Sequence, residues 1–164
     1  MTRLEVDVLT ALRLIAPGVA DLNFVSTPLS GRERIPVVRI ADNDEPLPLY
    51  SLGDGMLRAL GISLALVNVK DGILLIDEFE NGLYYSVQPD LWQFIFRVAR
   101  HLNVQVFATT HSWDCIEAFQ KAASADKQTE GLLIRLESKK DKIVATLFDE
   151  QELGIATREQ IEVR

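Results

Sequence analysis

The sequence has little cysteine, no long hydrophobic run and no N-terminal segment that resembles a secretion signal. Its single cysteine, Cys115, cannot form an internal disulfide, and no second cysteine or histidine pattern beside it supports metal or thiol catalysis. The longest strongly apolar stretch, 56–69, is too short to span a bilayer. Because no charged and then apolar segment opens the chain, we expect a cytoplasmic protein without a membrane partner.

The chain also lacks an excess of positive charge. It has 17 Lys and Arg against 24 Asp and Glu, a net charge of −7, which argues against a broad nucleic-acid footprint. Direct nucleic-acid binding stays open only for a larger assembly. The aromatic residues Trp92, Phe94 and Phe96 are typical of helix packing rather than of a base-stacking platform.

A phosphate-cradling loop of the form G-x-x-x-x-G-K-[ST] is absent from the 164 residues. None of the nine glycines is followed by lysine; they stand at positions 18, 31, 53, 55, 61, 72, 82, 131 and 154. The chain therefore lacks the Walker A motif, the usual means of holding nucleotide phosphates.

What is present is enough for a single domain with a real core, since 48% of the residues are hydrophobic. We expect one domain over 1–164, with an N-terminal helix and edge strands in 1–46, a core in 47–148 and an acidic surface tail in 149–164. In the first part, Leu4, Val8, Leu12 and Ile15 recur at helical spacing. Short β-type runs follow at 22–25, 35–40 and 47–50.

Turn residues separate these β-type runs: Thr27-Pro28, Ser30-Gly31 and 42–46. Pro36 and Pro48 indicate that the strands containing them lie at sheet edges.

The second part alternates helices with short apolar strands. A helix over 56–69, apolar on nearly every face, is expected to be buried. Strands are predicted at 73–76 and 104–109, each with both faces covered. A helix between them, capped by Ser86, turns an apolar stripe inward, and a further helix starts at His111-Ser112. Alternating residues at 132–137 and 142–148 predict a hairpin.

The β–α–β unit formed by these strands places polar residues at one edge of the sheet. Parallel strands joined by a right-handed crossover end on the same side, so Asp77-Glu78 and Thr109-Thr110-His111 are expected to meet there. This edge is where open α/β sheets bind ligands.

The residue types at this edge suit nucleotide hydrolysis. Asp77 can hold Mg²⁺, Glu78 can orient and deprotonate the attacking water, and His111 can sense or stabilise a γ-phosphate. The structural alternative is that strands often end in acidic residues because the chain is leaving the core.

A glycine-containing loop precedes the apolar helix: Ser51-Leu52-Gly53-Asp54-Gly55. Its Ser-x-x-Asp pattern is a variant of the capping box. A helix N-terminus opened by glycines also presents free N–H groups to an anion, and the Ser51 hydroxyl could join them.

In order and spacing, the loop at 51–55, the strand and acids at 73–78 with Asn81-Gly82, and the segment 108–112 resemble the C-terminal half of an ABC-type ATPase. The likeness is to the prokaryotic AAA-family ATP-binding proteins related to the OLD and SMC-like ATPases. It covers 47–148, and the ending 161–164 is similar to that family's C-terminus. The resemblance implies an α/β P-loop NTPase fold, with parallel strands, crossover helices and a C-terminal β-hairpin, and the cofactors ATP and Mg²⁺.

The resemblance also implies roles for individual residues. Asp77 would be the Walker B metal residue, Glu78 the catalytic base and His111 the switch histidine. The implied signature loop, which contacts ATP held by the opposite subunit, consists of Ser51, Gly53 and Gly55, although Asp54 and Gly55 depart from its common form.

The implied dimer-crossing D-loop contains Asn81 and Gly82. Arg58, one turn into the following helix, could reach the same phosphate or lie at the rim of the core.

Three functions stay open. The chain could be an ATPase half whose Walker A motif comes from another chain or a missing N-terminal region, within a homodimer or hetero-assembly. It could be a non-catalytic regulatory remnant that dimerises with a full-length ATPase. It could also be a metal-dependent nuclease using Asp77, Glu78, Glu80 and His111; its only Asp-x-Asp pair, at 42–44, fits an exposed turn far better.

Overall fold

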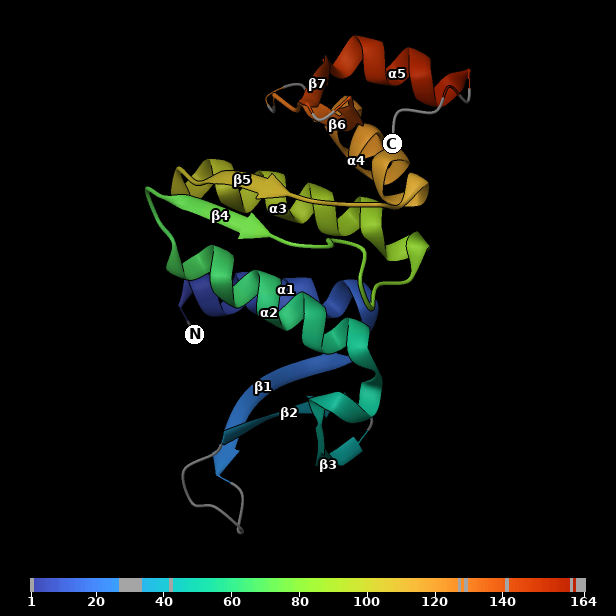
Figure 1. Cartoon of the computed structure of the whole chain (residues 1–164). Helices are drawn as coiled ribbons and strands as arrows, with labels where there is room; N and C mark the ends of the chain where they lie inside the picture. Colours follow the sequence, from blue (N-terminus) through green and yellow to red (C-terminus); the bar gives the residue numbers. More distant parts are fainter. Residues whose placement is uncertain are drawn as a thin grey trace.

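The computed structural model describes residues 2–26, 34–41, 43–126, 128, 130–140, 142–159 and 161. The turns expected at Thr27-Pro28 and Ser30-Gly31 lie outside the described residues, as do Asp42 of the Asp-x-Asp pair and the end of the chain at 162–164. In the described part, the strands form three small sheets, and helices lie between these sheets (Figure 1). No helix of this part is long and apolar enough to cross a membrane.

The N-terminal helix α1 (Arg3–Ile15) has the predicted amphipathic character. Thr2 and Glu5 form a capping box at its start, and one side of the helix buries Val8, Leu9, Ala11 and Leu12. This side packs against helix α2 (Asp54–Asn68), as Figure 1 shows.

The β-type runs form an antiparallel sheet in the order β1-β2-β3 (Val19–Ser26, Arg34–Ile40, Asn43–Pro48). The prediction of an edge strand at Pro36 is wrong, since β2 is the central strand. Proline is tolerated there because β3 pairs with β2 only from Val37 onward, so the missing N–H of Pro36 interrupts no bond to β3. The third run ends sooner than predicted, in the short 3-10 helix η1 (Leu49–Leu52).

The predicted β–α–β unit is confirmed. Strand β4 (Ile73–Ile76) pairs in parallel with β5 (Gln105–Ala108), with Ile73 opposite Gln105 and Ile76 opposite Ala108. The crossover runs through η2 (Tyr85–Val87) and α3 (Gln88–Leu102), whose stripe of Leu91, Ile95, Val98 and Leu102 is buried as expected. Ser86 does not cap α3: it lies within η2, and the helix starts after Val87 with no side-chain cap.

Both strands were expected to be covered on two faces, and this is wrong for the described chain. Leu74 and Ile76 are buried, but Ile73 is 58% and Leu75 74% exposed, and Phe107 of β5 is 48% exposed. Successive side chains of a strand point to opposite faces, so one face of this sheet is open. Helix α2 is likewise buried on one side only, with an exposed stripe at Leu57, Gly61 and Ala65.

The C-terminal part contains α4 (Trp113–Ala125), the predicted hairpin β6–β7 (Leu133–Lys139, Lys142–Phe148) and α5 (Glu150–Arg158). Ser112 caps α4 by accepting the N–H of Cys115. The acidic segment is largely exposed, as expected, and forms a helix whose Leu153 and Ala156 are buried against Ile116. Its capping box at Asp149 gives an acidic sequence a regular helix start.

Candidate functional site

Asp77 and Glu78, which follow β4, meet Thr109, which follows β5. The Thr109 hydroxyl donates to Asp77 Oδ1 over 2.6 Å and accepts the Glu78 backbone N–H over 2.9 Å. Backbone bonds of 2.9 Å from Thr109 N to Ile76 O and from Phe79 N to Thr109 O extend the parallel pairing past both strands. The predicted meeting of the two strand ends is therefore present, and one threonine side chain links the two acidic residues.

Arg58 holds this junction from the other side. Its Nη2 donates to the carbonyl oxygens of Asp77, at 2.5 Å, and Glu78, at 2.7 Å. Glu78 has a φ of 46°, in the left-handed region that non-glycine residues rarely adopt. Arg58 thus contacts the backbone of the two acidic residues. From the sequence, we expected its side chain either to reach a phosphate or to lie at the rim of the core.

The two carboxylates themselves are exposed. The Glu78 carboxylate accepts a long hydrogen bond, 3.5 Å, from the Asn81 amide. An exposed Asp77 fits Mg²⁺, which proteins bind through one or two carboxylates together with phosphate oxygens and water. The described residues contain no group of three or more His, Cys, Asp or Glu able to hold a metal by themselves.

His111 is fixed through its backbone to Glu80. Its N–H donates to Glu80 Oε1 over 2.9 Å, while the residue itself is exposed. Burial, the largest influence, raises the pKa of Glu80, but hydrogen bonds from the backbone N–H groups of His111 and Glu80 and from the Thr110 hydroxyl outweigh it, so that the pKa is lowered. Glu80 therefore favours its charged form and holds the segment that carries the predicted switch histidine.

The glycine-containing loop does not use the predicted cap. Ser51 lies in η1, where its hydroxyl donates to Pro48 O over 2.6 Å, and α2 starts at Asp54, after the N-cap residue Gly53, with no side-chain cap. The φ of Gly53 is 95°, which favours glycine. The local sequence leaves the first N–H groups of α2 without a serine partner.

The loop and the predicted D-loop touch within the chain. A Cβ atom at Gly55 would lie 3.0 Å from the carbonyl oxygen of Gly82, and a Cβ atom at Gly82 would lie 3.4 Å from the Cβ atom of Asp54. Gly82 also has a φ of 76°. These two glycines allow the start of α2 to approach the turn at Asn81-Gly82 and the junction beyond it.

Cys115 is a packed thiol. Burial raises its pKa to about 11, and the side chain packs in the core as expected. Trp92 stacks on Phe79 with ring centroids 4.0 Å apart, which confirms helix packing for this aromatic residue.

Sequence reasoning missed the roles of Thr109 and Arg58. The Thr109-Thr110 pair at a strand end was the only available signal for the first, and nothing local signalled the second.

The parallel β–α–β unit, with an acidic pair after one strand and a threonine-histidine segment after the next, belongs to an α/β fold similar to the P-loop NTPase fold of SMC ATPase heads. The chain belongs to the AAA family described as "AAA domain, putative AbiEii toxin, Type IV TA system", which matches residues 11–114. The resemblance to an AAA or ABC-type ATPase portion is thereby confirmed.

Two curated relatives match part of the chain. An uncharacterized protein of Methanocaldococcus jannaschii is 32% identical over 96 residues, which is 58% of this chain and 83% of that protein. An ATP/GTP phosphatase of Helicobacter pylori is 35% identical over 83 residues, 49% of this chain but 22% of the phosphatase. The chain thus spans less than a quarter of that larger relative.

Solved structures show the same fold at low sequence identity. A chain from work on ATP-driven dimerization and DNA-stimulated activation of SMC ATPases has a TM-score of 0.65 at 8% identity, covering 98% of this chain and 92% of its own. An Smc head bound to the C-winged helix domain of ScpA has a TM-score of 0.61 at 8% identity, covering 89% of this chain and 42% of that one. A head bound to Pyrococcus furiosus ScpA has a TM-score of 0.59 at 9% identity, with coverage of 97% and 38%.

Proposed function

We propose that this chain is the half of an ABC-type AAA ATPase that supplies the metal ligand, the catalytic base and the switch histidine to an ATP molecule. The observation that carries the proposal is the Asp77–Thr109–Glu78 junction, which binds the Asp77 carboxylate and the Glu78 backbone at one edge of a parallel sheet, where both acidic residues are exposed. The family match and the fold of the SMC heads support it.

Each residue has a defined task in this proposal. Asp77 would hold Mg²⁺, which neutralises charge on the phosphates when bound. Glu78 accepts a proton from the attacking water, and Asn81 steadies its carboxylate. His111 donates a hydrogen bond toward the terminal phosphate, on a segment fixed by Glu80.

The phosphates need a cradle that these residues do not contain. Because no G-x-x-x-x-G-K-[ST] stands in the sequence, the Walker A loop comes from another chain or from sequence outside these 164 residues. The loop at Ser51, Gly53 and Gly55 would then face a nucleotide held by the opposite subunit of a dimer. Such a contact requires the Ser51 hydroxyl to leave Pro48 O.

The test compares the chain alone with the chain assembled with a Walker A-containing ATPase. Alone, it should bind MgATP only weakly, with a Kd above about 10 μM by calorimetry, because no loop cradles the phosphates. In the assembly, Glu78→Gln should lower kcat by at least about 100-fold while nucleotide binding persists.

Glu117→Gln, which removes an exposed carboxylate on α4, is the matched control and should leave kcat unchanged. Submicromolar MgATP binding by the isolated chain, or full activity of the Glu78→Gln assembly, contradicts the proposal.

A further inference from the structure

Arg58 is a half-buried cation whose hydrogen bonds to described residues go to neutral groups. Its Nη2 donates to the carbonyl oxygens of Asp77, at 2.5 Å, and Glu78, at 2.7 Å. A second donor of the same guanidinium, Nε, is buried and has no partner in the described part of the chain. A buried donor without a partner lowers stability, so the stability of the fold does not by itself account for this side chain.

The two carbonyl groups reach one nitrogen because of the backbone at Glu78. In a regular strand, successive carbonyl groups point to opposite edges, where a single donor does not reach both. Glu78 instead has a φ of 46°, and this turn brings the carbonyl groups of residues 77 and 78 to Arg58 Nη2. A non-glycine residue keeps this left-handed conformation only where its surroundings hold it.

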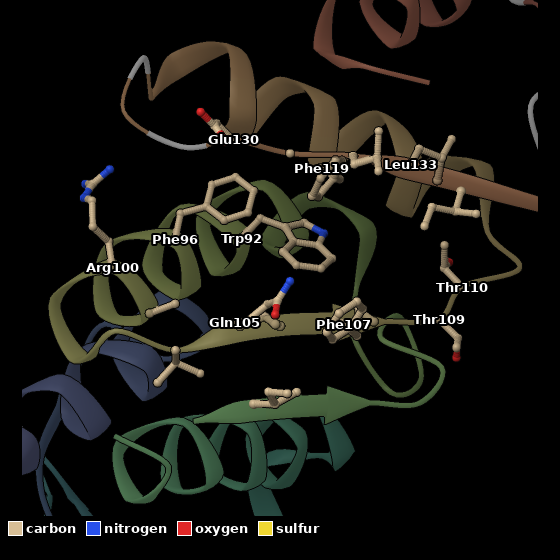
Figure 2. Close-up of a pocket in the computed structure, with 18 of the residues that line it drawn as sticks. Trp92, Phe96, Arg100, Gln105, Phe107, Thr109, Thr110, Phe119, Glu130 and Leu133 are labelled. Atoms are coloured by element: carbon tan, nitrogen blue, oxygen red, sulfur yellow. The ribbon is translucent and has the colours of Figure 1, made fainter. Parts of the chain in front are cut away.

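Strand β5 holds the other side of the same turn. Figure 2 shows the Thr109 side chain just past the end of β5. Its hydroxyl accepts the Glu78 N–H over 2.9 Å, and its carbonyl oxygen accepts the Phe79 N–H over 2.9 Å. The N–H groups of the turn are thus bound to the sheet and its carbonyl groups to α2. The orientation of Glu78 therefore depends on where α2 lies relative to β5.

Helix α2 touches the same turn at a second point, near its own start. A Cβ atom at Gly55 would lie 3.0 Å from the carbonyl oxygen of Gly82, so the two backbones are in close contact there. Arg58 stands about one helical turn further along α2. Because one turn of a helix moves as a unit, a shift of the start of α2 changes both contacts together.

From these contacts we infer that Arg58 is a positioning residue for Glu78. It holds the backbone of Glu78 in the left-handed conformation and links that backbone to the loop at 51–55, which begins the same helix. The inference rests on the proposed function, in which Glu78 accepts a proton from water and the loop meets a nucleotide of the opposite subunit. Nucleotide binding at the loop then reaches the base through the first turn of α2.

The first measurement concerns the backbone of the isolated chain. Arg58→Met keeps an extended apolar side chain but removes the donors, and NMR detects the φ of Glu78 through its intraresidue NOE between HN and Hα. This NOE is strong where φ is positive, because the two protons are then closest. We expect a strong NOE in the wild type and, in Arg58→Met, an NOE as weak as that of residues with negative φ.

Two further variants accompany this comparison. Arg58→Lys should keep the strong NOE, because a single nitrogen with several hydrogens makes both contacts in the wild type. Arg58→Gln, whose amide ends well short of the Nη2 position, should lose the NOE and replaces Arg58→Met if that variant does not fold.

The second measurement uses the assembly with a Walker A-containing ATPase. Arg58→Met should lower kcat at least about tenfold and change the KM for MgATP by less than about twofold, because Arg58 contacts the base and not the nucleotide. Arg58→Lys should recover part of the lost kcat. Arg97→Met, which removes an exposed arginine of α3, is the matched control and should leave both parameters unchanged.

Wild-type kcat of Arg58→Met in an assembly that Glu78→Gln inactivates overturns the inference and leaves the proposed function standing. An unchanged Glu78 NOE in folded Arg58→Met also overturns it. So does a raised KM with unchanged kcat, which would place Arg58 on the nucleotide. Full activity of both Glu78→Gln and Arg58→Met contradicts the proposed function itself, and the inference fails with it.

Discussion

The Thr109 hydroxyl is the smallest unit on which the candidate site depends. Thr109→Val keeps the shape of the side chain but removes its bonds to Asp77 Oδ1 and Glu78 N. Because the residue is exposed and water can replace part of the loss, we expect a cost of about 0.5–1.5 kcal/mol in the free energy of unfolding. Urea denaturation measures it, and Thr109→Ser, which retains the hydroxyl, should cost clearly less. Equal costs for the two variants would show that the hydroxyl does not hold the junction.

Glu80 should make stability depend on pH. Its pKa is lowered in the folded chain, so the folded state binds its proton less readily than the unfolded state. The stabilising contribution is therefore fully present above the ordinary glutamate pKa and is lost as the pH falls through the lower, folded value. Glu80→Gln keeps an oxygen for the His111 N–H but removes the charge.

The difference in unfolding free energy between wild type and Glu80→Gln should be largest near pH 7 and should shrink as the pH falls below the ordinary glutamate pKa. Urea titrations at a series of pH values measure it, with Glu117→Gln as the charge-matched control. A difference that grows in acid would contradict the assigned shift.

At the scale of residues, the sequence allowed the acidic pair and the histidine segment to be placed at one sheet edge, but not their contacts. The meeting of residues 77 and 109 could be predicted, because the apolar runs locate the two strands and the handedness of the crossover makes them parallel. The Arg58 contacts depend on how α2 crosses the end of β4, which no local pattern encodes. The same limit explains why the Ser-x-x-Asp pattern misled: Ser51 is held in η1 by Pro48.

Among the elements, the contact between the start of α2 and the turn at Asn81-Gly82 sets a requirement for glycine. Gly82→Ala should lower the free energy of unfolding by about 1–2 kcal/mol, because its φ of 76° is unfavourable for any side chain. Gly61→Ala, in the middle of α2 with no atom within 4 Å of the new Cβ, should raise it by about 0.5–1 kcal/mol.

Thermal and urea unfolding of the two variants test this pair of opposite effects. A stable Gly82→Ala protein would mean that the turn has another accessible backbone conformation.

Element identity was the most predictable property of the fold, and element partners the least. Helical spacing located α1 and the stripe of α3, and alternation located the hairpin β6–β7. The strand containing Pro36 was wrongly predicted to be an edge strand. The sequence shows that Pro36 lacks an N–H, but it does not show where the neighbouring strand β3 ends, and this decides whether a hydrogen bond is lost. The helix in the exposed acidic segment after Phe148 was not predicted, because it packs through only two apolar residues, Leu153 and Ala156.

For the molecule as a whole, the open face of the β4–β5 sheet is the largest departure from expectation. The runs at 73–76 and 104–109 have the composition of strands buried on both faces, whereas the structure covers one. Composition reflects the complete set of contacts that a sequence makes, including those with polypeptide outside these 164 residues. The discrepancy is what we expect if the assembly proposed above covers this face.

This view predicts very different stability costs for substitutions at neighbouring residues of one strand. Leu75 is 74% exposed, so Leu75→Thr should change the unfolding free energy of the isolated chain by less than about 0.5 kcal/mol. Leu74 is 8% exposed, and Leu74→Thr should cost about 2–4 kcal/mol, since it loses buried apolar contacts and buries a hydroxyl. Threonine suits a strand in both places, so backbone preference cancels in the comparison.

Leu75→Thr with Phe107→Thr should also reduce binding of the apolar dye ANS, because both substitutions remove exposed apolar surface from the same face. Urea denaturation and ANS fluorescence measure the two effects, and equal destabilisation by Leu74→Thr and Leu75→Thr would mean that the sheet is covered on both faces in the isolated chain.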